Sequence, residues 1–185
     1  MQLRNVFLAT LASAIVALGQ NTADVPFQVS VATNLSAGES PVNLTNSGAS
    51  AATNICVSLY TLLPNSQMVS CCSCQVAPDG LVTLGVNKDL TNNAVQTSVV
   101  IKLVATTPVG TCAASAGTTG TQANGLVAYL TTLSPVANTG TYNATNQTFV
   151  ASSLSPAEYT HLTSVCSTNF GGGGLCSSCN PALRH

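Results

Sequence analysis

Residues 55–62 read Ile-Cys-Val-Ser-Leu-Tyr-Thr-Leu, and residues 67–74 read Gln-Met-Val-Ser-Cys-Cys-Ser-Cys. Because side chains alternate between the two faces of a strand, the first segment places Ile55, Val57 and Leu59 on one face. The tripeptide Pro-Asn-Ser at residues 64–66 is typical of a turn. The sequence therefore predicts a β-hairpin over residues 55–74.

Short segments with the same alternation lie on both sides of this hairpin. They contain β-branched or aromatic residues and are separated by Gly, Pro, Asn and Ser, which is the pattern of strands joined by turns. The expected strands are Phe27 to Val31, Val42 to Leu44, Leu81 to Val86, Val95 to Thr106, Gly125 to Leu133 and Thr148 to Val150.

One helix is indicated near the C-terminus. Ser155-Pro156-Ala157-Glu158 is a capping box with Pro at the first helical position. Apolar residues then recur at helical spacing as far as Cys166. Many short strands followed by one helix predict a mainly β fold, an antiparallel β-sandwich with one short C-terminal helix packed on an edge or end and stapled by disulfides.

The N-terminus has the pattern of a signal peptide. Arg4 precedes an uncharged apolar run that ends in Ala17-Leu18-Gly19, where small residues suit a signal peptidase. We predict that residues 1–19 are removed and that residues 20–185 form a single β-sandwich domain with a cysteine-rich C-terminal tail (166–179). No later segment is long and apolar enough to span a bilayer, so a secreted or cell-surface location is expected.

The chain carries very few charges. It has four Lys and Arg and five Asp and Glu, and because only Arg4 lies before residue 20, residues 20–185 carry a formal charge of −2. A nucleic-acid binder needs clustered Lys and Arg to displace counterions, so we expect no nucleic-acid partner. Weak electrostatic repulsion between copies favours lateral association.

All eight cysteines follow the predicted cleavage site, and an even count in an exported chain indicates four disulfides among 105 possible pairings. The turn at residues 64–66 leads us to expect a bond from the first cysteine to one of the cluster at residues 71–74. Adjacent strand residues point to opposite faces, so the Cys-Cys doublet should not bond to itself. The remaining cluster members are expected to pair with the tail cysteines, reached through a flexible tetraglycine spacer, and Cys112 with Cys166. The cysteines are Cys56, Cys71, Cys72, Cys74, Cys112, Cys166, Cys176 and Cys179.

A zinc site is the alternative interpretation of these cysteines. Cys71, Cys72 and Cys74 could combine with the pair Cys176 and Cys179, because CxxC is a common half-site. An oxidising compartment favours disulfides instead. We therefore assign no metal and no cofactor.

Two pairs of residues are candidates for catalytic or ligating groups. Glu158 and His161 share one face of the predicted helix, but helical carboxylate metal sites need matching helices that this chain lacks. Asp79 and Asp89 flank a predicted strand and could meet as a carboxylate pair for glycoside hydrolysis, although each has the sequence context of a surface turn. We assign no catalytic residue.

Four Asn residues match the N-glycosylation pattern, which has a meaning only in a eukaryotic host. They are Asn34, Asn43, Asn143 and Asn146.

The cysteine framework resembles a known family. The segment from Asn54-Ile55-Cys56 through the cluster at 71–74 to Pro78-Asp79-Gly80-Leu81, together with Gly174-Leu175-Cys176, is similar to an uncharacterised family of small exported bacterial proteins. The similarity would cover residues 54–104 and 149–179. The resemblance implies an exported protein from a bacterial host and no known activity.

We expect a secreted, non-enzymatic structural or adhesive protein, a subunit of an extracellular surface assembly. Sparse charge and the absence of a catalytic motif favour this hypothesis. The strand-like segment Asn21–Thr33 could pair with a sheet edge of a neighbouring copy. An extracellular carbohydrate- or ligand-binding module is the alternative, weakened by the absence of Trp, and a secreted hydrolase is the second alternative.

Overall fold

The computed structural model describes residues 24–48, 53–94, 96–114, 120–174 and 176–179. The predicted signal peptide (residues 1–19) lies outside the described residues. The strands are β1 (Phe27–Thr33), β2 (Pro41–Asn46), β3 (Ile55–Leu62), β4 (Met68–Val76), β5 (Leu81–Gly85), β6 (Ser98–Thr106), β7 (Leu126–Pro135), β8 (Tyr142–Thr148) and β9 (Val150–Ala151).

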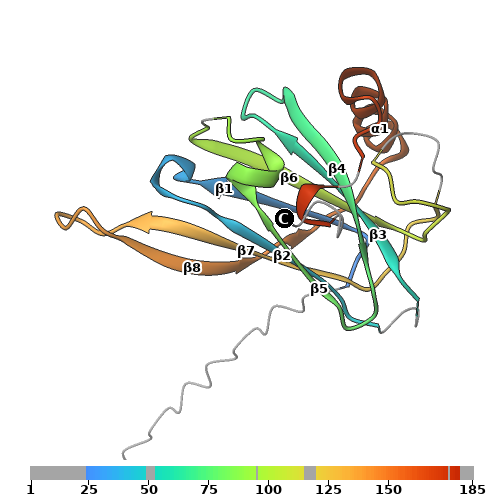
Figure 1. Ribbon diagram of the computed structural model, residues 1–185, viewed down its shortest axis with the longest axis horizontal. Coiled ribbons are helices and arrows are strands. Elements are labelled where there is room, and N and C mark those ends of the chain that lie inside the picture. The colour runs from blue at the N-terminus through green and yellow to red at the C-terminus, as the bar shows by residue number, and fades with distance from the viewer. Residues whose placement is uncertain (1–23, 49–52, 95, 115–119, 175, 180–185) are drawn as a thin grey trace, which may run out of the picture.

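These strands form two antiparallel sheets that face each other (Figure 1). The first, sheet A, has the order β4-β3-β6-β1-β9, and the second, sheet B, has the order β5-β2-β7-β8. The predicted antiparallel β-sandwich is therefore confirmed. Within the described residues, no helix is both long and apolar enough to cross a membrane.

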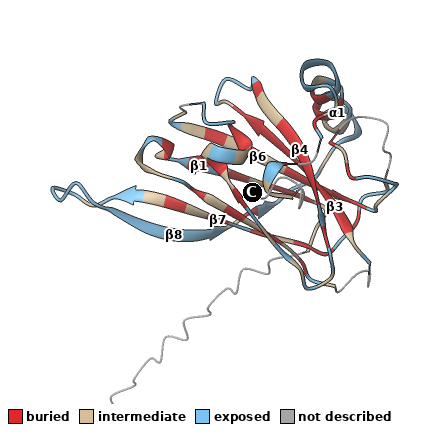
Figure 2. Cartoon of the chain, in the orientation of Figure 1, coloured by how far each residue is buried: buried red, intermediate tan, exposed pale blue. Residues whose placement is uncertain are grey.

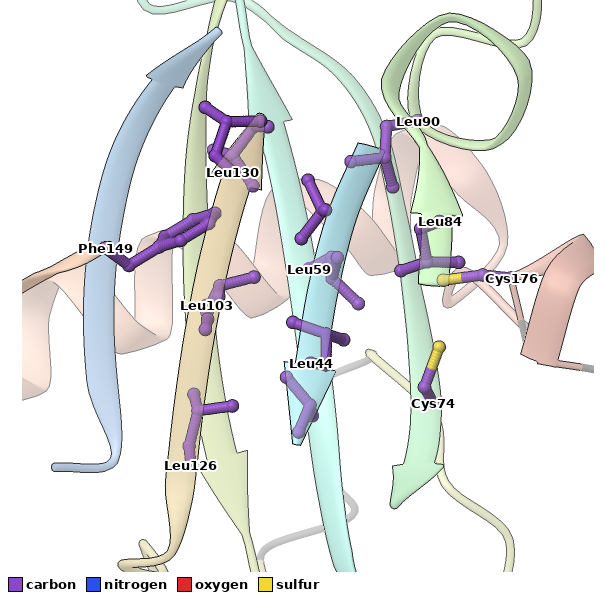
Figure 3. Close-up of a cluster of buried hydrophobic side chains, with 14 of the residues drawn as sticks. Leu44, Leu59, Cys74, Leu84, Leu90, Leu103, Leu126, Leu130, Phe149 and Cys176 are labelled. Atoms are coloured by element: carbon purple, nitrogen blue, oxygen red, sulfur yellow. The ribbon is translucent and has the colours of Figure 1, made fainter. Parts of the chain in front are cut away.

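The predicted hairpin is β3 and β4. Ile55 pairs with Val76 and Leu59 with Cys72, and the register shifts between Thr61 and Leu62 near the turn. Alternation directs Ile55, Val57 and Leu59 toward sheet B, where they meet leucines such as Leu44 in the main core (Figure 3).

Every residue of β3 is buried, because both faces of sheet A are covered. On the outer face a second apolar cluster joins Tyr60 and Phe27 to Leu162 and Cys166 of helix α1 (Pro156–Phe170). Figure 2 shows buried residues along β3 and over much of β6, and buried residues also occur on α1.

The predicted helix cap is present in α1. The Ser155 hydroxyl accepts a hydrogen bond from the Glu158 amide at 3.1 Å. The helix ends at Phe170 and is capped by Gly171, whose left-handed backbone (φ 61°) favours glycine. The Glu158 carboxylate does not complete the box; it forms an ion pair with Lys102 of β6 at 2.6 Å, which ties the helix to sheet A.

Strand β8 was not predicted. Its sequence, Tyr-Asn-Ala-Thr-Asn-Gln-Thr, has no alternation of apolar and polar residues, and its side chains are exposed except for the half-buried Thr148. A strand that buries neither face leaves no periodic signal in the sequence. The segment after β8 changes sheets at Phe149, whose amide donates to Ala128 of sheet B, before β9 pairs with β1 of sheet A.

Candidate functional site

The eight cysteines form four disulfides, which confirms the predicted number. They are Cys56–Cys112, Cys71–Cys166, Cys72–Cys176 and Cys74–Cys179. The predicted separation of Cys71 from Cys72 is correct, because the first faces α1 and the second faces the main core. The prediction that cluster cysteines bond to Cys176 and Cys179 is also correct.

Two predicted pairings are wrong, namely Cys56 with the cluster and Cys112 with Cys166. Cys56 lies opposite Gln75 on β4, and on its own face of the sheet the cluster offers only Cys71, which lies opposite Tyr60, four positions away. Four strand residues span about 13 Å, beyond the reach of a disulfide. On its other side Cys56 lies opposite Thr106, where β6 ends, so the loop that follows delivers Cys112 to it.

Tyr60 fixes the same loop from the outer face of sheet A. Its hydroxyl donates to the Ala114 carbonyl at 3.0 Å. Burial raises the pKa of Tyr60 well above its ordinary value, and a nearby tyrosine, Tyr159, acts in the same direction. The phenol therefore stays protonated and remains a hydrogen-bond donor.

The zinc interpretation does not fit the bonding state of these residues. Cys74, Cys176 and Cys179 place their sulfur atoms within 4.8 Å of one another. All three are in disulfides, and zinc binds the thiolate form of cysteine. The arrangement of these sulfurs is that of a covalent staple.

The C-terminal tail lies along the edge of β4. The Ser73 amide donates to the Gly174 carbonyl, and the Cys176 amide donates to the Ser73 carbonyl, both at 3.1 Å. These bonds and the two tail disulfides hold the tail on the outer edge of sheet A at Ser73. The tetraglycine segment was predicted to be a flexible spacer, but Gly173 is packed tightly against the disulfide of Cys71 and Cys166.

Asp89 holds the end of this tail. Its carboxylate accepts hydrogen bonds from the Ser177 hydroxyl, from the Ser178 hydroxyl at 2.8 Å and from the Gly85 amide at 2.7 Å. Partial burial favours the neutral acid, but these hydrogen bonds and the positive charge of Lys88 outweigh it, so the pKa of Asp89 lies below its ordinary value.

Replacing Asp89 by Asn is expected to lower the free energy of unfolding by about 1 kcal/mol at neutral pH, since a charged acceptor at a half-exposed site is partly screened. A depressed native pKa means that the carboxylate stabilises the fold above its unfolded pKa of about 3.9 and loses this contribution as the pH falls through the native pKa. Denaturant unfolding at pH 7 and pH 3 should therefore show a difference from wild type that shrinks in acid. The exposed Asp79→Asn variant is the control, and a difference independent of pH would contradict the assignment.

Asp79 and Asp89 do not form a carboxylate pair. They lie beyond opposite ends of β5, a five-residue strand, which spans about 17 Å. Glycosidase carboxylates lie about 5–9.5 Å apart. Glu158 is paired with Lys102, and His161 is exposed on α1. The structure thus assembles neither of the two candidate pairs that the sequence suggested.

An open groove of about 750 Å³ lies where the sheets diverge, and sequence reasoning missed it. It is lined by β1, β7, β8 and β9, with Val31, Thr132 and Val150 among its residues and no charged side chain. Val31 and Val150 are 45% and 68% exposed. The groove is thus an open, uncharged recess with two exposed valine side chains.

The groove borders a free backbone edge of β1. The Phe27 carbonyl accepts from the Ser152 amide after β9, so by strand alternation Val31 and Thr33 direct their amides and carbonyls to the same side. The β9 pairing extends only from Gln28 to Val29. The side-chain amide of Gln147 donates to the Val31 carbonyl at 3.2 Å and spans the groove there.

Strand β8 supplies a second free edge. The Val136 amide donates to the Thr141 carbonyl, so Asn143, Thr145 and Gln147 direct their backbone groups toward β7. The residues between them direct theirs to the outer side, where the described residues place no strand. Figure 1 shows β7 and β8 projecting together from the body, and Figure 2 shows β8 exposed along its length.

The segment Asn21–Thr33, expected to pair with another copy, is only partly available. Asn21 to Ala23 lie outside the described residues. Residues 27–33 are β1, which pairs with β6 along its whole length. The part of this edge that no strand covers is at Val31 and Thr33, where the Val31 carbonyl accepts from the Gln147 side chain.

Of the four sequons, Asn143 and Asn146 lie on β8 and are exposed. The side chain of Asn34 donates to the Leu133 carbonyl, and that of Asn43 accepts from Thr83 on β5.

The fold and the site define a disulfide-bonded β-sandwich with two free sheet edges beside an uncharged groove. Comparisons with protein-family models, with curated proteins and with solved structures found no match for this chain. The resemblance to exported bacterial proteins therefore stays a prediction.

Proposed function

We propose that this protein is a secreted, non-enzymatic structural or adhesive protein that acts as a subunit of an extracellular surface assembly. The observation that carries the proposal is β8, a seven-residue edge strand without a charge, a proline or a bulge. Natural edge strands are usually protected by such features, because free backbone groups pair readily with other chains. An unprotected edge supports a role in pairing.

The covalent framework supports the extracellular part of the proposal. Four disulfides form and persist in oxidising compartments. Three of them bond Cys71, Cys72 and Cys74 of β4 to α1 and the tail. The tail therefore lies on the outer edge of sheet A at Ser73, while the described residues place no segment on the edge of sheet B at β8.

Residues 20–185 are expected to form oligomers as the concentration rises, and Ala144→Lys on the edge strand is expected to suppress them. The added charge meets the approaching strand and must be desolvated. Thr45→Lys places the same charge on an interior strand of sheet B and should leave assembly unchanged. Sedimentation velocity and negative-stain microscopy check this, and monodisperse monomer at every concentration would contradict the proposal.

A neutral-carbohydrate binder is the second candidate. Tyr129 and Tyr142 are 38% and 47% exposed and lie on the outer face of sheet B, because Tyr142 pairs with Pro135, six positions from Tyr129. Asn43 lies opposite Tyr129 on the same face. Aromatic rings beside amide groups can stack on and hydrogen-bond to a sugar. A glycan array without a single bound glycan would remove this candidate.

A further inference from the structure

We infer that β8 pairs with β8 of a second copy, antiparallel across a two-fold axis centred on Thr145, so that sheet B continues from one copy into the other. The inference rests on the proposed function and names the partner and the register. Residues 142, 144, 146 and 148 direct their backbone groups outward, as derived above from the hydrogen bond between Val136 and Thr141.

The register follows from the length of the strand. Residues 142 and 148 bound β8, and only an antiparallel pairing centred on Thr145 gives every one of its residues a partner. In this register Tyr142 faces Thr148 of the second copy, Ala144 faces Asn146, and every outward amide and carbonyl is hydrogen-bonded. A shift by one residue leaves the end of each strand unpaired.

Charge decides whether two strands can pair across a two-fold axis, because a charged side chain near the axis would lie close to the same charge on the second copy. From Leu103 to Ala157 the sequence contains no Asp, Glu, Lys, Arg or His. The two strands can therefore approach without like-charge repulsion. The register places Asn143 opposite Gln147 of the second copy. The Gln147 side-chain nitrogen already donates to Val31 within its own copy, so its carbonyl oxygen is the group that can accept from the Asn143 amide.

In this pairing the groove receives the turn between β7 and β8 of the second copy. Because Tyr142 of that copy lies beside Thr148, the turn at its residues 136–141 runs on toward Val150. The groove at this place is lined by Val31, Thr148 and Val150. The inserted turn would cover the exposed Val31 and Val150 side chains. The same dimer contact would therefore pair the free edge of β8 and bury these two apolar side chains.

A single pair of strands is a small contact. Stable dimers bury about 1,200–2,000 Å² in total, so we expect a weak dimer that depends on concentration. Its register is best tested by covalent trapping. Thr145 directs its backbone toward β7, so Thr145 and its copy form a non-hydrogen-bonded pair with Cα atoms about 4.5 Å apart, within the range of a disulfide.

The experiment uses Thr145→Cys, which adds one free thiol to a chain whose own cysteines are all paired. Mild oxidation of Thr145→Cys should give a covalent dimer on a non-reducing gel. Asn143→Cys alone should stay monomeric, because it faces Gln147, and a mixture of Asn143→Cys with Gln147→Cys should give the crossed dimer. Circular dichroism checks that each variant is folded.

The register of the β8 pair and the structural role of the protein can be contradicted separately. If wild type assembles but Thr145→Cys gives no more covalent dimer than Asn143→Cys, the register is wrong while the structural role stands. If wild type is monomeric at every concentration and no variant crosslinks, both are wrong.

Discussion

Removing both tail disulfides, Cys72–Cys176 and Cys74–Cys179, is expected to lower the free energy of unfolding by about 5 kcal/mol, and removing either one alone by about 2 kcal/mol. The double loss should thus exceed the sum of the single losses. Both disulfides join β4 to the tail, with sequence separations of 104 and 105.

The reason is that the loops are nested. Cys71–Cys166 already closes a span of 95 residues, so with that bond in place Cys72–Cys176 closes a ring of only about a dozen residues. The second tail disulfide then closes a still smaller ring. Either tail bond alone keeps the tail on β4, and only the double removal frees it.

Alanine replaces both cysteines of a pair, so that no thiol is left to form a new bond. Denaturant unfolding followed by circular dichroism gives the free energies, and removal of Cys56–Cys112, which closes a separate loop, serves as the comparison. The free energy lost on removing Cys56–Cys112 should add to the free energy lost on removing the tail disulfides. Strictly additive losses for the two tail disulfides would contradict the nested arrangement.

Gly173→Ala is expected to lower the free energy of unfolding by about 3 kcal/mol. A Cβ atom at this position would lie 2.6 Å from the sulfur of Cys71 and 2.9 Å from that of Cys166. Its φ of +53° lies in the left-handed region, which strains a side-chain-bearing residue. Neither the disulfide nor the end of α1 can move away without disturbing the second apolar cluster.

The next residue supplies the matched control. A Cβ atom at Gly174 meets nothing within 4 Å, and its φ is not in the left-handed region. Gly174→Ala should therefore change the free energy of unfolding by no more than about 0.5 kcal/mol. Thermal and denaturant unfolding of both variants measure the contrast, and equal effects would show that the packing of Gly173 against the disulfide is not what matters.

Local patterns in the sequence were enough for the fold class. The alternation at Ile55, Val57 and Leu59 shows which side chains a strand must bury, and it is visible within a few neighbouring residues. The cap at Ser155 is equally local, because it joins residues three positions apart. The number of disulfides follows from the even cysteine count together with the predicted signal peptide, and the separation of Cys71 from Cys72 follows from strand geometry.

Disulfide connectivity, by contrast, depended on which strand lies beside β3. The hairpin was correct, but the second neighbour of β3 is β6, distant in sequence, and it is the end of β6 that brings Cys112 to Cys56. The free edge of β8 and the groove at Val31 also arise only when two sheets diverge in space. Pairing between strands far apart in the chain decides these features, and such pairing is set by the packing of the whole sandwich, which no local pattern of residues encodes.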